Sequence, residues 1–173
     1  MIRTTLDVKL QESKHHYEHM IQYVNEKDLT KLKYEISAFI NAARSILQYA
    51  HKTAKQQDKE NVYKELVSAN PTLKFFKDLR DENIHTKLVE VTAHANAEIT
   101  MGFIIRQENT TDEEIEGIKA EQANQTPLQT RTIEQYFFDE KPEEEVLPLC
   151  EKYLVELEKF TAEAKVKGIA PVI

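Results

Sequence analysis

Several residue types are scarce in this chain of 173 residues, and each scarcity excludes a class of protein. There is no Trp, and only three Gly and five Pro are present. Turn-forming residues are therefore too few for an all-β fold with many turns. The single cysteine, Cys150, excludes an internal disulfide framework, and we expect a buried thiol there. No apolar run approaches the ~18 residues of a membrane span, so we expect a cytoplasmic protein without membrane attachment.

The net charge of −7 is distributed unevenly along the chain. Residues 1–88 carry 15 Lys and Arg against 12 Asp and Glu, a net charge of +3. Residues 89–173 carry 8 against 18, a net charge of −10. The overall charge opposes indiscriminate binding of nucleic acid, but the local field decides whether a phosphate is attracted. The N-terminal half therefore permits such a contact.

Apolar residues in the N-terminal half recur at alternating spacings of three and four, which is the pattern of amphipathic helices. We expect long helices over 5–25 and from Asp28, the N-cap, to the polar stretch 55–58. Their short connection makes them antiparallel. A short helix is expected over 59–69, and the next helix starts at Pro71. The stripes of the two long helices comprise Leu6, Leu10, Ser13, Tyr17, Met20 or Ile21, Val24, Leu29, Leu32, Ile36, Phe39, Ala43, Ile46 and Ala50.

From residue 89 the apolar pattern changes to a period of two. Odd positions over 89–105 are apolar and most even ones are polar, which predicts a strand, with a helix over 93–97 as the alternative. Residues 130–138 are strand-like again. We therefore expect 89–138 to be a β-hairpin elaboration with a mobile tip at 109–130.

The chain closes with a helix expected over 144–167, which Gly168 ends. Its inward stripe comprises Val146, Leu149, Tyr153, Leu157, Phe160 and Ala164. The predicted fold class is mainly α, an antiparallel bundle of four to five helices with an inserted β-hairpin before the last helix. Residues 1–173 are expected to form one helical domain.

The segment 79–85, Leu-Arg-Asp-Glu-Asn-Ile-His, brings a permanent cation, a carboxylate and an imidazole within two helical turns. Asp81 and His85 are four residues apart, so on a helix the carboxylate would hydrogen-bond the imidazole and favour its protonated form. Arg80 lies about 140° around the helix from His85. The two side chains therefore converge only if the helix loosens at its end or two copies of the chain meet.

The spacing from Arg80 to His85, with the polar Asp81 directly after the arginine, resembles the Arg, about four to six residues, His motif of the HEPN superfamily. The resemblance implies a helical bundle over residues 5–88 plus the last helix. It also implies a metal-independent endoribonuclease of the toxin–antitoxin or abortive-infection type, acting as a homodimer with two motifs facing across a cleft. RNA and a cognate antitoxin or other protein are the implied partners.

In that interpretation Arg80, Asp81 and His85 are the catalytic residues. His85 would transfer protons and Arg80 would hold the phosphate. Two alternatives stay open: a non-catalytic HEPN-like dimer that binds nucleotide, RNA or a partner protein, and a purely structural network at a helix end, where a cation complements the helix dipole.

Further polar residues are candidates for supporting roles. Arg44 would bind the phosphate or pair with an acidic residue of a neighbouring helix, and Asn83 is a second binding candidate. Glu35 and Asn41 share the helix of Arg44 and would assist it.

His15 and His19 lie one helical turn apart and would either share a metal ion or belong to a solvated helix face. Two imidazoles alone make a weak site, and no Cys or suitably spaced further His follows nearby in the sequence. The sequence therefore assigns no metal site and no cofactor.

Overall fold

The computed structural model describes residues 3–85, 90–99 and 130–173. Their helices and strands are α1 (Thr5–Glu26), α2 (Leu29–Gln56), α3 (Glu60–Ser68), α4 (Pro71–His85), β1 (Val91–Ile99), β2 (Thr130–Phe138), β3 (Lys141–Glu145) and α6 (Val146–Val166). The described part is mainly helical, as predicted, with one small sheet of strand order β1-β2-β3. None of its helices has the length and apolar character that a membrane crossing requires.

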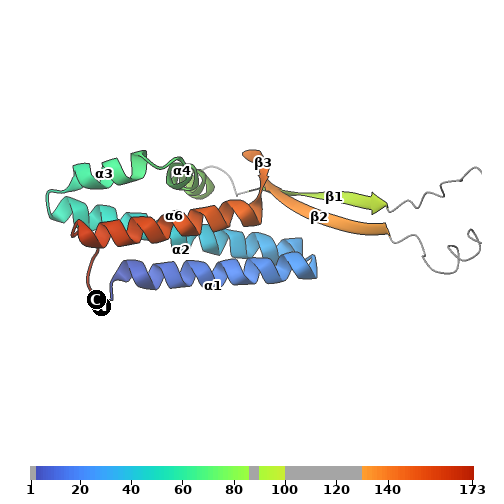
Figure 1. Cartoon of the computed structure of the whole chain (residues 1–173), viewed down its shortest axis with the longest axis horizontal. Helices are drawn as coiled ribbons and strands as arrows, with labels where there is room; N and C mark the ends of the chain where they lie inside the picture. Colours follow the sequence, from blue (N-terminus) through green and yellow to red (C-terminus); the bar gives the residue numbers. More distant parts are fainter. Residues whose placement is uncertain (1–2, 86–89, 100–129) are drawn as a thin grey trace, which may run out of the picture. The chain divides into compact units, whose positions relative to one another are not determined.

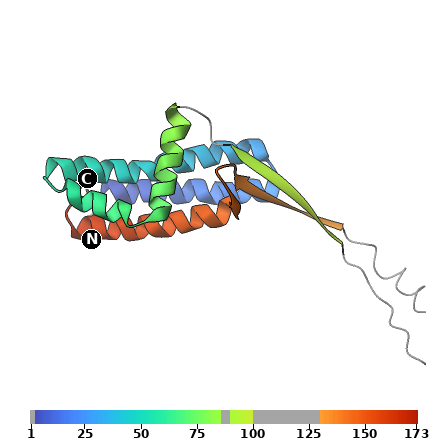
Figure 2. The same cartoon turned by 90° about the horizontal axis from the view of Figure 1, so that it is seen from above.

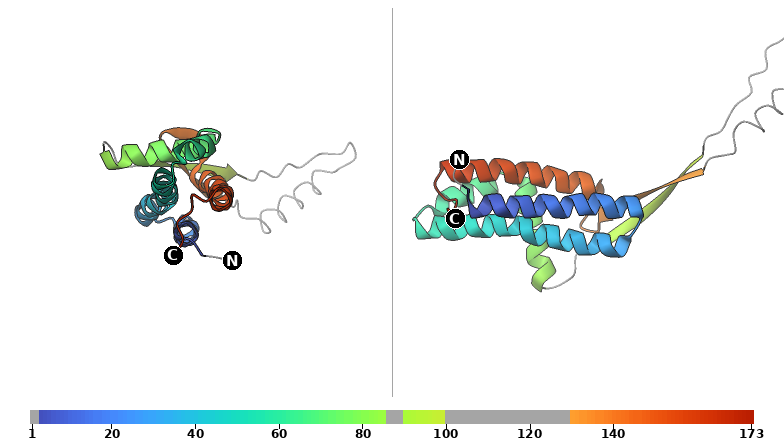
Figure 3. Two further views of the ribbon diagram at one scale, coloured as in Figure 1. Left: turned by 90° about the vertical axis from the view of Figure 1, so that its left-hand side faces the viewer. Right: turned by 90° about the horizontal axis from the view of Figure 1, so that it is seen from below.

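The chain divides into two compact units. The first comprises Met1–Ala93 and Tyr136–Ile173 and holds the described helices, and the second comprises His94–Gln135 and holds the remaining parts of β1 and β2. In the first unit the long helices α1, α2 and α6 lie side by side, with α1 antiparallel to the other two (Figure 1). Figure 2 shows α4 crossing these helices steeply, and Figure 3 shows it lying over α2 and α6.

The first two helices begin and end close to the predicted positions because local signals determine both ends. Thr4 and Asp7 form a capping box at the start of α1, and Asp28 caps α2 by accepting a hydrogen bond from the Lys31 N–H. The apolar residues predicted to lie on one face of each helix form the core or pack against it. Met20 is fully buried whereas Ile21 is 39% exposed, so Met20 is the inward residue of that pair.

Aromatic rings in the core attach α4 to the long helices. The rings of Phe76 and Tyr153 are stacked, with centroids 4.1 Å apart and planes within 2°. Phe39 of α2 meets Tyr153 edge to face at 6.1 Å, and Phe138 of β2 meets Phe76 at 6.1 Å. The same region contains the expected buried thiol of Cys150, whose pKa burial raises. One aromatic cluster thus joins α2, α4, α6 and β2.

The last helix starts later than predicted, at Val146, because the residues before it form β3. This strand pairs antiparallel with β2, with Phe137 opposite Glu145 and Phe138 opposite Lys141. The predicted end at Gly168 is confirmed. Gly168 has a φ of 71°, in the left-handed region that favours glycine.

Of the expected hairpin over 89–138, the structure describes residues 90–99 and 130–138. β1 lies beside β2, as predicted for the two strand-like runs. The Asp139 N–H donates to the Glu90 carbonyl at 3.3 Å, and the Thr92 hydroxyl donates to the Asp139 carboxylate at 2.8 Å. The rest of the predicted first strand, to residue 105, and the tip expected at 109–130, apart from residue 130, lie outside the described residues.

The two ends of the described chain pair with each other. Thr4 forms an isolated antiparallel bridge with Val172, and the Thr5 N–H donates to the Pro171 carbonyl at 3.0 Å. Asp7 reinforces this contact because its carboxylate accepts hydrogen bonds from Thr4 and from Lys165 of α6. Asp7 therefore both caps α1 and connects it to α6.

Replacing Asp7 by Asn is expected to lower the free energy of unfolding at neutral pH by about 1 kcal/mol. Desolvation raises the pKa of Asp7, but the hydrogen bonds from Lys165 and Thr4 outweigh it and hold the pKa below its ordinary value. The stabilisation is therefore complete above the pKa of the unfolded chain, about 4, and is lost as the pH falls through the lower folded value. Urea unfolding of both proteins should show a difference that narrows as the pH falls below about 4.

Glu158→Gln is the matched control, because Glu158 of α6 pairs with Lys14 of α1 but caps no helix. This exposed ion pair should contribute less than about 0.5 kcal/mol. Equal losses in the two variants would contradict the role given to Asp7.

Candidate functional site

The candidate site forms where α4 crosses α2. Arg44 interrupts the buried stripe of α2, between the fully buried Ala43 and Leu47. On α4, Leu79 is buried in the core and Arg80 and Asp81 follow it directly. The crossing brings residues together that are far apart in the sequence.

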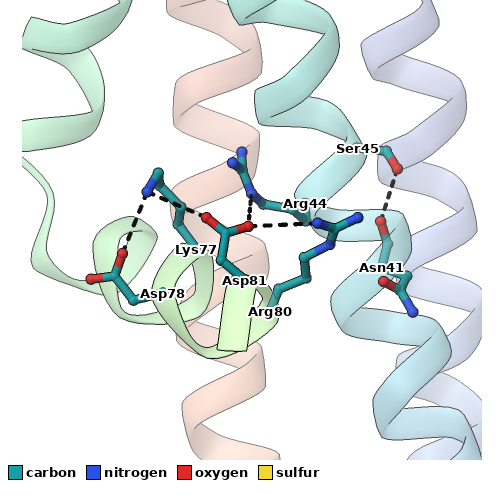
Figure 4. A network of polar contacts seen from close by, with 7 residues as sticks. All are labelled: Asn41, Arg44, Ser45, Lys77, Asp78, Arg80 and Asp81. Carbon is teal, nitrogen blue, oxygen red and sulfur yellow. Dashed lines mark hydrogen bonds and ion pairs between the residues drawn. The ribbon is translucent and has the colours of Figure 1, made fainter. Parts of the chain in front are cut away.

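The Asp81 carboxylate lies among three cationic side chains (Figure 4). Its Oδ1 is 3.6 Å from Arg44 Nε and 3.6 Å from Arg80 Nη1, and its Oδ2 is 3.5 Å from Lys77 Nζ. Lys77 also reaches Asp78 at 3.4 Å. We refer to Arg44, Lys77, Arg80 and Asp81 as the Asp81 cluster.

Both arginines are largely buried, and part of their hydrogen-bonding capacity is unused. The side chain of Arg44 is 11% exposed and that of Arg80 is 19% exposed. Nε and Nη1 of Arg44 and Nε of Arg80 are buried and have no hydrogen-bond partner among the described residues. The distances of 3.6 Å to Asp81 are too long for hydrogen bonds. The cluster therefore presents guanidinium donors that one carboxylate does not satisfy.

Two tyrosines complete the surroundings of Arg44. Burial raises the pKa of Tyr63 and of Tyr153, and the positive charge of Arg44 opposes that rise in both. The buried hydroxyl of Tyr153 has no hydrogen-bond partner among the described residues. Both phenols therefore stay protonated and add polar O–H groups near the guanidinium.

Of the predicted site residues, the structure brings Arg80, Asp81 and Arg44 together. The alternative proposed for Arg44, an ion pair with an acidic residue of a neighbouring helix, is present and involves Asp81. His85 is the last residue of α4, one turn after Asp81. The side chains of His85 and Asn83 lie outside the described residues, so the expected contact between Asp81 and His85 stays a prediction.

The two supporting residues predicted on α2 make other contacts. Glu35 accepts from His16 Nδ1 at 2.8 Å and lies 3.5 Å from His19 Nδ1, so it joins α1 to α2. The Asn41 carbonyl accepts from the Ser45 hydroxyl at 2.8 Å, within α2 (Figure 4). Among the described residues, neither side chain forms a hydrogen bond or ion pair with the Asp81 cluster.

The histidines of α1 pack against one another. The rings of His15 and His19 meet edge to face at 4.2 Å. In the described part of the chain, no group of three or more His, Cys, Asp or Glu side chains has an arrangement that would hold a metal ion.

Sequence reasoning missed Lys77, Tyr63 and Tyr153 as members or neighbours of the site. Lys77 carried a usable signal, since it precedes Asp81 by four residues on one helix. Tyr153 lay on the predicted core stripe of α6, and nothing in its spacing indicates an electrostatic interaction with an arginine of α2. Comparison of the chain with protein-family models, curated protein sequences and solved structures finds no match.

Replacing Asp81 by Asn is expected to lower the free energy of unfolding by about 1 kcal/mol. The variant leaves Arg44, Arg80 and Lys77 close together without the carboxylate between them. The loss stays modest because Asp81 is 39% exposed and water screens the charges. Phosphate should then raise the melting temperature of the variant more than that of the wild type, because the anion takes the position of the carboxylate.

Asp78→Asn is the control, since Asp78 is on the same helix and, within the described part of the chain, pairs with Lys77 alone. It should change stability little and should respond to phosphate as the wild type does. A phosphate response of Asp81→Asn no larger than that of the control would show that the cluster does not accept an anion.

Proposed function

We propose that the protein is a HEPN-like RNA-binding protein in which Arg44 and Arg80 hold a phosphate of the RNA backbone. The observation that carries the proposal is the pair of largely buried guanidinium groups whose N–H donors lack hydrogen-bond partners within the described residues. Guanidinium groups are planar and donate in pairs, which matches the oxygens of a phosphate.

The charges around the pair support an anionic ligand. Three cations, Arg44, Lys77 and Arg80, face two carboxylates, Asp81 and Asp78. The excess is positive although the whole chain carries −7. Because the arginines are partly desolvated, their attraction for a phosphate is stronger than that of exposed lysines.

The resemblance to the HEPN superfamily extends this proposal to a homodimeric assembly. A symmetric homodimer would place two copies of the Asp81 cluster on one RNA, and the second contact would then form at a high effective concentration. A role in a toxin–antitoxin or abortive-infection system, with an antitoxin or other protein as partner, belongs to the same proposal and is supported by the motif alone.

Metal-independent cleavage of RNA is the second candidate function. It is favoured by the position of His85, which ends the helix that carries Arg80, one turn after Asp81. Each chain would contribute one histidine, and cleavage needs both an acid and a base, so this function requires the dimer.

Arg44→Gln and Arg80→Gln are each expected to weaken binding of a single-stranded RNA by about tenfold and to lower the dependence of log affinity on log salt by about 0.7. The reason is the loss of one phosphate contact in each variant. Fluorescence anisotropy of a labelled RNA over a series of salt concentrations measures both quantities.

Lys9→Gln is the matched control: Lys9 is a partly buried cation on α1, paired with Glu12 of its own helix. It removes the same charge without touching the site and should leave RNA affinity within about twofold of the wild type. If all three variants bind equally, the phosphate site is wrong.

Cleavage is tested on the same RNA in the presence of EDTA. If the second candidate is right, wild type cleaves, and His85→Ala loses at least about 100-fold in rate while still binding the RNA. His94→Ala is the control, because this exposed histidine of β1 lies outside α4. Identical rates for wild type and His85→Ala would leave binding as the function.

A further inference from the structure

An open groove of about 370 Å³ lies beside the Asp81 cluster, between α2, α3 and α4. Its lining includes His51 of α2, Tyr63 and Val67 of α3, and Lys74 and Lys77 of α4. Tyr63 and Val67 are buried and make part of the lining apolar. We refer to this feature as the His51 groove.

An aromatic stack forms one wall of the groove. The rings of His51 and Tyr63 are stacked, with centroids 4.5 Å apart and planes 20° apart. Tyr63 also meets the edge of Phe160 at 6.2 Å. Tyr63 is therefore enclosed, whereas the His51 side chain is 35% exposed and its Nε2 lies 3.3 Å from Glu60 Oε1. An exposed ring of this kind is a platform for another planar ring.

Lysines at the rim supply positive charge. Lys64 pairs with Glu60 at 3.2 Å, and Lys77 pairs with Asp78 and Asp81. Lys74 is exposed and forms no ion pair within the part of the chain that the structure describes. The groove thus combines an aromatic platform with an ammonium group available to an anion.

Two residues connect the His51 groove to the Asp81 cluster. Lys77 lines the groove, and its Nζ is 3.5 Å from Asp81 Oδ2. Tyr63 also lines the groove, and the positive charge of Arg44 opposes the rise that burial causes in its pKa. A ligand in the groove would therefore have the arginines as its immediate neighbours.

We propose that the His51 groove receives one unstacked nucleobase of a single-stranded RNA whose phosphate is held by Arg44 and Arg80. This inference rests on the proposed function and specifies its substrate as single-stranded. The base stacks on the outer face of His51, and Lys74 attracts the neighbouring phosphate. A base within a duplex is paired and stacked and cannot enter the groove, so duplex RNA loses this contact.

The test measures binding of a labelled single-stranded RNA, and of the duplex with its complement, by fluorescence anisotropy. Wild type should prefer the single strand. His51→Ala should weaken single-strand binding by about tenfold and duplex binding by less than about twofold, whereas His51→Phe keeps a ring and should stay close to the wild type. His15→Ala is the control, because it removes an exposed imidazole on α1 that also contacts neighbouring rings.

The outcomes separate this inference from the function on which it rests. If RNA binding depends on Arg44 and Arg80 but His51→Ala binds the single strand as wild type does, the groove is not a base site and the phosphate site stands. An equal affinity of wild type for single strand and duplex would likewise overturn the base site. Failure of wild type to bind either RNA would overturn both proposals.

Discussion

The stacked contact between Phe76 and Tyr153 determines where the polar residues of α4 lie. Phe76 precedes Arg80 by one helical turn, so a fixed ring at Phe76 also fixes the direction in which the end of α4 runs. Tyr153 of α6 is fully buried, and the positive charge of Arg44 on α2 opposes the rise that burial causes in its pKa. One apolar contact therefore aligns the helices whose cationic side chains surround Asp81, and the adjoining groove depends on the same alignment.

Periodicity predicted the long helices because each buries one continuous stripe against its neighbours. It failed at Lys141–Glu145, which form β3 although three successive glutamates and a proline have low strand propensity. Pairing with Phe137 and Phe138 of β2 determines that strand, and such a contact has no signal within the five residues themselves. Similarly, spacing left Met20 and Ile21 equivalent, and packing between α1 and α2 selects Met20.

The candidate site was predictable in its residues and less so in its contacts. The sequence pointed to Arg80 and Asp81 because the segment 79–85 combines a cation, a carboxylate and an imidazole, and to Arg44 because it interrupts an apolar stripe. Spacing along one helix relates Asp81 to His85 and equally to Lys77, but it contains no information on the crossing of α2 and α4. Arg44 and Asp81 are far apart in the sequence, and their ion pair exists because tertiary packing brings these helices together. The unused guanidinium donors are likewise a property of the packed structure.

The order of elements along the chain also has a consequence for synthesis on the ribosome. Tyr153 and the other buried residues of α6 complete a core whose first part, α1 to α4, has ended at His85. Residues 86–145 must be translated before α6 begins, which takes roughly 3–12 s at usual elongation rates. During that interval Phe39 and Phe76 lack the ring contacts that Tyr153 makes with them in the folded protein. The nascent chain therefore passes through a period in which part of its core is uncovered, and exposed apolar surface of this kind is prone to aggregation.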